Sequence, residues 1–131
     1  MSTYPAIDLH LHLDGALRTQ TILDLAREQD YALPANTVKE LDQLVRVVPE
    51  CRTLTDFLKT FEIFYPLLKT PEVLERIARE LVEDLENQGL LYAEVRFAPI
   101  LNVVNPENIH ELRAAVEAVH QLRGRAAARQ V

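Results

Sequence analysis

Apolar and polar residues alternate strictly near the start of the chain. The apolar set is Ile7, Leu9, Leu11 and Leu13, and the polar set is Asp8, His10, His12 and Asp14. Because successive side chains of a strand point to opposite faces, this period of two predicts a β-strand over residues 7–12. A second strand is predicted over residues 90–98, where apolar residues again occupy every other position before Pro99.

Between these two segments the apolar spacing becomes helical, which predicts helices over residues 21–29, 37–45 and 53–65. Thr19 is the expected cap of the first of these helices, and Pro66 is expected to end the third. A fourth helix should begin at Pro71 after the capping residue Thr70, and it should end before Gly89. Its apolar face comprises Val73, Leu74, Ile77, Ala78, Leu81, Val82 and Leu85.

The last predicted helix starts at Asn105 and Pro106, and Gly124 and a polar tail follow it. Its expected inward residues are Ile109, Leu112, Ala115, Val116, Val119 and Leu122. Strands joined by helical crossovers favour a parallel sheet, so the predicted fold is α/β and rich in helix. Two parallel strands make a poor independent sheet, and we therefore expect their exposed edges and apolar faces to need further cover.

Composition narrows the classes of function. The chain has 131 residues, 48% of them apolar, a net charge of −6 and one cysteine, Cys51. An acidic chain without a basic cluster argues against a nucleic-acid partner or an anionic membrane surface. No signal peptide is evident at the N-terminus, and no apolar run approaches the roughly 20 residues of a membrane span. A cytoplasmic protein without a disulfide is expected.

His10 and His12 are the sharpest chemical feature. Residues two apart on a strand face the same way, so their imidazoles should project together, which suits two ligands of one metal ion. Asp14 should lie on the same side and could hold a substrate hydroxyl, and Gly15 would let the backbone turn beside a ligand. An exposed histidine pair without a metal also explains the spacing, and the spacing alone favours it over a metal site. His110 and His120 are expected to be surface or packing residues.

Three segments resemble the adenosine deaminase family of the amidohydrolase superfamily. Residues 7–17, Ile-Asp-Leu-His-Leu-His-Leu-Asp-Gly-Ala-Leu, are similar to the family's opening strand. Residues 93–99, Ala-Glu-Val-Arg-Phe-Ala-Pro, resemble its second barrel strand. Residues 54–61 between them resemble the segment that lines and gates the substrate pocket. The three segments agree in order and spacing, so residues 1–131 are predicted to be the N-terminal part of one metal-dependent hydrolase domain.

The resemblance implies a role for each matching residue. His10 and His12 would be two zinc ligands, and Asp14, beside Gly15, would contact the ribose end of a purine nucleoside. An apolar wall or lid would be formed by Leu54, Phe57, Leu58 and Phe61. Without the resemblance, an aromatic stripe at helical spacing would be assigned to the core. Free-adenine deaminases that resemble this family tend to have Glu where Asp14 stands, so adenosine or deoxyadenosine is the expected substrate.

The implied fold is a partial (β/α)₈ barrel, consisting of its first two strands and a mostly helical insertion between them. The implied reaction is attack of zinc-activated water on C6 of adenosine, giving inosine and ammonia. No catalytic residue, third zinc histidine or His-x-x-Glu motif is found in the sequence. We therefore expect weak zinc binding or none, no turnover by these residues alone, and self-association or a complementing chain. The alternatives are another amidohydrolase-type deaminase, acting on adenine or a modified nucleoside, and a non-catalytic helical interaction module.

Overall fold

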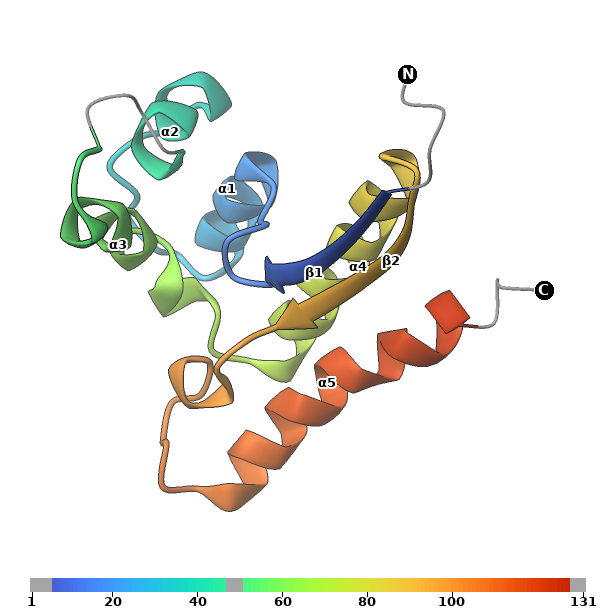
Figure 1. The fold of residues 1–131 in the computed structure, drawn as a ribbon. Coiled ribbons are helices and arrows are strands. Elements are labelled where there is room, and N and C mark those ends of the chain that lie inside the picture. The colour runs from blue at the N-terminus through green and yellow to red at the C-terminus, as the bar shows by residue number, and fades with distance from the viewer. Residues whose placement is uncertain (1–5, 47–50, 128–131) are drawn as a thin grey trace.

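The computed structural model describes residues 6–46 and 51–127, with side chains as far as residue 120. A run of helices separates the two strands, and a further helix follows the second strand, as Figure 1 shows. The elements are β1 (Ala6–His12), α1 (Thr19–Glu28), α2 (Val38–Val45), α3 (Leu54–Glu62), the 3₁₀ turn η1 (Tyr65–Leu67), α4 (Pro71–Asn87), β2 (Leu90–Arg96), the 3₁₀ turn η2 (Pro99–Leu101) and α5 (Ile109–Ala127).

The two strands pair in parallel, which confirms the predicted α/β arrangement. Asp8 pairs with Ala93 and Leu11 with Val95, so β1 advances three residues while β2 advances two. This extra residue is a β-bulge, which bends a strand and redirects its side chains. The bulge lies directly beside His10 and was not predicted from the sequence.

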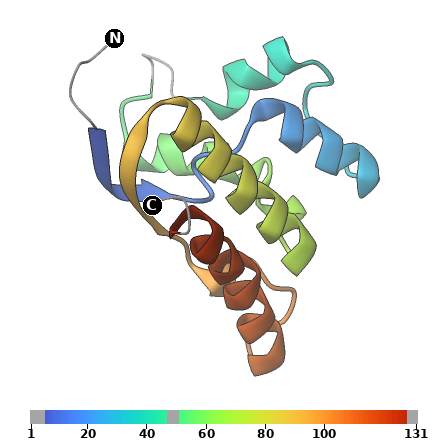
Figure 2. The same cartoon turned by 90° about the vertical axis from the view of Figure 1, so that its right-hand side faces the viewer.

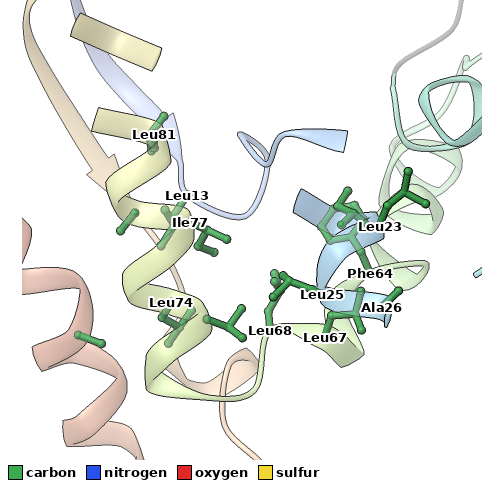
Figure 3. Packing of buried hydrophobic residues seen from close by; sticks show 14 of the residues in the cluster. Leu13, Leu23, Leu25, Ala26, Phe64, Leu67, Leu68, Leu74, Ile77 and Leu81 are labelled. Carbon is green, nitrogen blue, oxygen red and sulfur yellow. The ribbon is translucent and has the colours of Figure 1, made fainter. Parts of the chain in front are cut away.

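Helix α4 is the centre of the packing. Figure 2 shows the strands at one side of the molecule, with α4 beside them and α5 alongside α4. Figure 3 shows Leu13 from the end of β1 against Ile77 and Leu81, while Leu68 and Leu74 continue the core toward α1. Since these side chains are almost completely buried, α4 holds β1 and α1 together through apolar contact.

The ends of α4 are as the sequence predicts. The Thr70 hydroxyl accepts the backbone N–H of Val73 at 3.4 Å, and Pro71 is the first helical residue. Gly89 follows the helix with a φ of 76°, a conformation that glycine adopts without the steric cost of a Cβ. These local signals stop α4 where β2 must begin.

Two predicted helix ends before α4 are wrong. Arg18, and not Thr19, precedes α1, and the Thr19 hydroxyl donates instead to the carboxylate of Asp42. Helix α3 ends at Glu62, and Pro66 lies in the separate turn η1.

Helix α5 begins at Ile109, later than predicted, and it continues through Gly124 to Ala127. Only part of its expected inward face is buried. Ala115 is buried and Leu112 and Val119 pack partly against the core, whereas Ile109 and Val116 are exposed. The Leu122 side chain lies outside the described side chains.

A set of ion pairs fixes α1 against α4. The Arg76 guanidinium lies 2.9 Å from Asp24 of α1 and 3.0 Å from Glu80, one turn along its own helix. Arg18 lies 2.6 Å from Asp84 at the other end of this contact. Because α1 follows directly after the turn at Asp14 and Gly15, these pairs restrain the loop that leaves β1.

The sheet remains open on one side. Ile7 and Leu9 of β1 and Leu91 of β2 are all more than half exposed. The expectation that the strands lack cover therefore holds for the part of the chain that the structure describes.

No helix among residues 6–46 and 51–127 is both long and apolar enough to cross a membrane.

Candidate active site

The histidine pair lies at the C-terminal end of β1. As the alternating pattern predicts, the imidazoles of His10 and His12 lie side by side, with their Nε2 atoms 3.2 Å apart and their ring centroids 5.2 Å apart. Both side chains are exposed, and the two Nε2 atoms are within hydrogen-bond distance of each other. A ligand approaching the end of the strand would meet both rings at once.

The separation of these nitrogens suits one metal ion. Zinc binds imidazole nitrogen at about 2.0–2.1 Å with tetrahedral angles, which places two such nitrogens about 3.3 Å apart. The observed 3.2 Å between the Nε2 atoms is close to that value. Catalytic zinc usually takes three protein ligands. No group of three metal-ligating side chains occurs within the described residues, so this pair supplies only part of such a set.

The bulge in β1 is held by a local hydrogen bond. The backbone N–H of His10 donates to Oδ1 of Asp8 at 2.9 Å. Such a bond offers the backbone an alternative to the ladder hydrogen bonds of the sheet. Asp8 therefore restrains the backbone at His10, a role that the sequence did not indicate.

Asp14 lies beside the pair but is buried, with 9% of its surface exposed. Its Oδ1 lies 4.0 Å from Nδ1 of His12, which is too far for a hydrogen bond. Its Oδ2 accepts the hydroxyl of Tyr65. Of the buried side-chain atoms in the described part of the chain, Oδ1 of Asp14 is the one that lacks a hydrogen-bond partner.

Tyr65 is a site residue that sequence reasoning missed. It was assigned to the end of a helix, but it begins η1, 51 residues away in sequence from the aspartate that it contacts. Burial, and then the hydrogen bond to Asp14, raise the pKa of Tyr65 above the usual value of 10.0. The phenol therefore keeps its proton at neutral pH and acts as a donor to the carboxylate.

The chain turns at Asp14 and Gly15, as expected, but Gly15 makes this turn without a positive φ. The positive-φ glycine among the described residues is Gly89, and Gly15 has an ordinary φ. A Cβ built on Gly15 would lie 3.9 Å from Cε1 of Phe61, which is normal van der Waals contact. Gly15 thus marks the place where the turn after β1 approaches the aromatic side chains of α3.

The predicted apolar wall lies on one face of α3 and divides into two parts. Phe61 packs against the core, and Phe57 meets it edge to face with ring centroids 5.1 Å apart. Leu54 and Leu58 are 71% and 52% exposed and project from the same helix face. Since Phe61 also reaches Gly15, the wall begins next to the turn that holds Asp14.

The other histidines stay apart from this constellation. His110 and His120 are exposed on α5, as expected, and neither belongs to a metal-ligating group in the described part of the chain. The structure thus brings together His10, His12, Asp14, Gly15 and Phe61, with Tyr65 added. Leu54 and Leu58 are placed at the outer end of the same wall.

Comparisons with known proteins identify the family. The adenosine deaminase family model matches residues 5–130. Adenosine deaminase of Clostridium botulinum strain 657 is 44% identical over 112 residues, which is 86% of this chain and 34% of that protein. Adenosine deaminase of Vibrio vulnificus is 41% identical over 112 residues, with the same shares. The chain therefore spans about a third of the length of the curated relatives that it matches.

Solved structures agree with the fold. Adenine deaminase from Arthrobacter aurescens has a TM-score of 0.76 at 24% identity, covering 93% of this chain and 35% of that one. An amidohydrolase from Burkholderia ambifaria with bound Zn has a TM-score of 0.70 at 24% identity, covering 92% and 32%. Arabidopsis ADAL complexed with GMP has a TM-score of 0.61 at 28% identity, covering 91% and 34%.

The architecture is thus part of a (β/α)₈ barrel, as the resemblance predicts. The three segments that resemble the family lie on β1 and the turn after it, on α3, and on β2 and the residues after it. With nearly the whole chain matched by the family model, this protein belongs to the adenosine deaminase family.

Proposed function

We propose that His10, His12, Asp14, Gly15 and the apolar face of α3 form the first part of a zinc-dependent active site. The complete site would deaminate adenosine or deoxyadenosine. The observation that carries the proposal is the pair of imidazole nitrogens 3.2 Å apart at the end of β1, in a member of this family. Active sites of (β/α)₈ enzymes lie at the C-terminal ends of the strands, which is where His10, His12 and Asp14 are found.

In this proposal His10 and His12 would hold the zinc ion through their imidazole nitrogens. When bound, zinc lowers the pKa of a water molecule, which supplies hydroxide near neutral pH. The protein's own contribution here is to orient the ligands. The hydrogen bond from the His10 N–H to Asp8 and the bulge restrain the backbone from which the His10 side chain projects. Two ligands make a weak site, so the described residues alone should bind zinc weakly and should not turn over adenosine.

Asp14 is proposed to accept a hydroxyl of the sugar, and Gly15 to give the substrate room beside it. The unpartnered carboxylate oxygen can accept a hydroxyl, and free adenine has no sugar hydroxyl to offer there. This favours a nucleoside over the free base. The second candidate is a different amidohydrolase-type deaminase, acting on adenine or a modified nucleoside. The fold that this chain shares with the Arthrobacter adenine deaminase and with Arabidopsis ADAL complexed with GMP supports this candidate.

The apolar face of α3 is proposed to cover the purine. Leu54 and Leu58 are exposed, whereas a core stripe would bury them, so the face has a free apolar surface at that end. Phe57 and Phe61 would form its inner part, next to Gly15. Apolar side chains that flank a few fixed polar groups are the usual lining of a small-molecule site.

The uncovered strands support a third possibility, in which the chain associates with itself or with a complementing chain. A groove of about 490 Å³ lies between β1 and α4, and Asp8, Asp84 and Gln88 line it together with apolar residues. The exposed apolar side chains of the strands themselves, Ile7, Leu9 and Leu91, favour association. A non-catalytic interaction module would form oligomers, and its association would not depend on His10 and His12.

The decisive experiment grafts this chain onto a relative. Residues 5–130 replace the matching segment of the 44% identical Clostridium botulinum adenosine deaminase, and inosine formation and zinc content are measured. We expect zinc binding and turnover of adenosine. His10→Ala should reduce turnover more than about a hundredfold, since even loss of an outer-shell partner of a metal ligand costs 10–100-fold. The matched control, His110→Ala, should leave turnover unchanged because His110 is exposed on α5.

Three outcomes separate the readings. A graft that acts on adenine but not adenosine would support the second candidate. A folded graft without zinc or turnover, together with stable oligomers of the chain by itself, would support the interaction module. Stoichiometric zinc and turnover by these residues alone would contradict the proposed division of the ligand set.

A further inference from the structure

One oxygen of the Asp14 carboxylate is buried without a partner. Oδ1 is shielded from solvent and has no hydrogen bond within the described residues, while Oδ2 is engaged by Tyr65. Leaving a buried acceptor unpaired is unfavourable by about 1–3 kcal/mol, so such atoms in native proteins call for an explanation. The nearest ring nitrogen, Nδ1 of His12, is 4.0 Å away and does not satisfy it.

Tyr65 determines which of the two oxygens stays free. Its hydroxyl reaches Asp14 from η1, and its ring packs against Phe61 at 5.7 Å and Phe64 at 6.0 Å between centroids. Phe64 is buried in the core, so the tyrosine ring is anchored on a fixed surface. A carboxylate held at one oxygen by an anchored donor cannot rotate freely about its last torsion.

The same tyrosine joins the two halves of the proposed site. Phe61 is the inner residue of the apolar wall, and Asp14 is the polar group beside the histidine pair. Tyr65 contacts both, and Phe61 in turn approaches Gly15. The distance between wall and carboxylate is therefore fixed by one side chain that neither the histidine motif nor the periodicity of α3 identifies.

We propose that Tyr65 is a positioning residue, which holds the Asp14 carboxylate so that its free oxygen accepts a hydroxyl of the sugar of a purine nucleoside. The inference rests on the proposed function, and it adds the residue that makes Asp14 selective for a hydroxyl. The Tyr65 phenol is suited to this role because it stays protonated and donates to Oδ2 of Asp14. Oδ1 is then the carboxylate oxygen without a partner that a ligand hydroxyl would bond. A hydrogen bond to a charged acceptor is then made only by a ligand that brings its own donor.

The test measures nucleoside binding and not turnover. Dissociation constants of the full chain for adenosine and for 2′-, 3′- and 5′-deoxyadenosine are obtained by NMR titration. Tyr65→Phe keeps the ring and removes the hydroxyl. We expect adenosine to bind about tenfold more weakly to this variant, the effect of misplacing one hydrogen bond to a charged group. For the one analogue that lacks the hydroxyl held by Asp14, wild type and variant should bind alike.

Two controls separate positioning from general damage. Tyr31→Phe makes the same chemical change at an exposed tyrosine after α1 and should alter no dissociation constant. In an Asp14→Asn background, Tyr65→Phe should have no further effect, because the tyrosine acts through the carboxylate. A partly unfolded variant would weaken all four nucleosides equally, so the comparison among analogues does not depend on full stability.

Each other result overturns the inference. Equal weakening of adenosine and all three analogues by Tyr65→Phe would make the residue merely structural. Unchanged binding would show that Asp14 needs no positioning, and absence of any nucleoside binding by the chain would remove the proposed ligand. Deamination by the graft is a separate readout, so the proposed function can fail while hydroxyl selectivity through Tyr65 stands, and the reverse.

Discussion

Leu74 of α4 offers the sharpest test of how the site is supported. It is completely buried, at 0% exposure, and Figure 3 shows it on the face of α4 that carries the core toward Leu68. Leu74→Ala removes three carbon groups, which at about 0.8 kcal/mol each amounts to about 2.4 kcal/mol of lost burial. Since the surroundings relax only partly, the cavity raises the total to about 3–4 kcal/mol.

The matched change is Leu54→Ala on α3, where the side chain is 71% exposed. The same atoms are removed there, but a surface substitution alters the free energy of unfolding by no more than about 0.5 kcal/mol. If Leu54 belongs to the wall, Leu54→Ala should instead weaken nucleoside binding. The pair therefore separates a residue that builds the scaffold from one proposed to serve the ligand.

Urea denaturation followed by far-UV circular dichroism measures both changes. With a slope of about 2 kcal/mol per M, Leu74→Ala should lower the unfolding midpoint by about 1.5–2 M, or leave the chain unfolded in buffer. Leu54→Ala should shift it by less than about 0.3 M. Equal midpoint shifts for the two variants would refute the packing described for α4.

Three further outcomes are expected. Thr70→Ala should destabilise the fold by about 1 kcal/mol through loss of the α4 cap, measured by thermal unfolding. Gly89→Ala should lower the free energy of unfolding by about 1–2 kcal/mol, because the φ of Gly89 is 76°. Gly15→Ala should lower it by less than about 0.5 kcal/mol, because Gly15 has an ordinary φ and a new Cβ would meet only normal contact distances. The urea unfolding midpoints of the two variants measure the difference. The Thr19 hydroxyl, and then Arg46, hold the pKa of Asp42 below its usual 3.8, so its stabilisation is complete above that pH and is lost as pH falls through the lowered pKa. Asp42→Asn should therefore lose less stability than wild type between about pH 7 and pH 3, and an equal loss would remove Asp42 from the acid response.

Signals that act within a few residues were predicted well. The alternation over residues 7–12 predicted that His10 and His12 project together, because residues two apart on a strand face the same way, and the pair keeps this arrangement beside the bulge. Thr70, Pro71 and Gly89 set the ends of α4 by the same kind of local rule. Both sets of features depend on backbone geometry and are readable without knowledge of distant contacts.

Contacts between distant segments were missed, and they account for the errors. Thr19 has the right chemistry for a cap, but its hydroxyl is drawn to Asp42, 23 residues away. Tyr65 reads as the end of a helix because nothing near it in sequence indicates Asp14. Gly124 reads as a terminator, yet α5 continues through it. Such outcomes depend on what packs against each residue, which a single sequence does not display.

The central claim is that His10 and His12 act as one pair toward a single metal ion. The most direct measurement follows the ring nitrogens of all four histidines by NMR while Zn²⁺ is added to the chain. We expect the Nε2 signals of His10 and His12 to shift together with one weak dissociation constant, while those of His110 and His120 stay in place. A shift of only one of the pair, or equal shifts at all four rings, would contradict it.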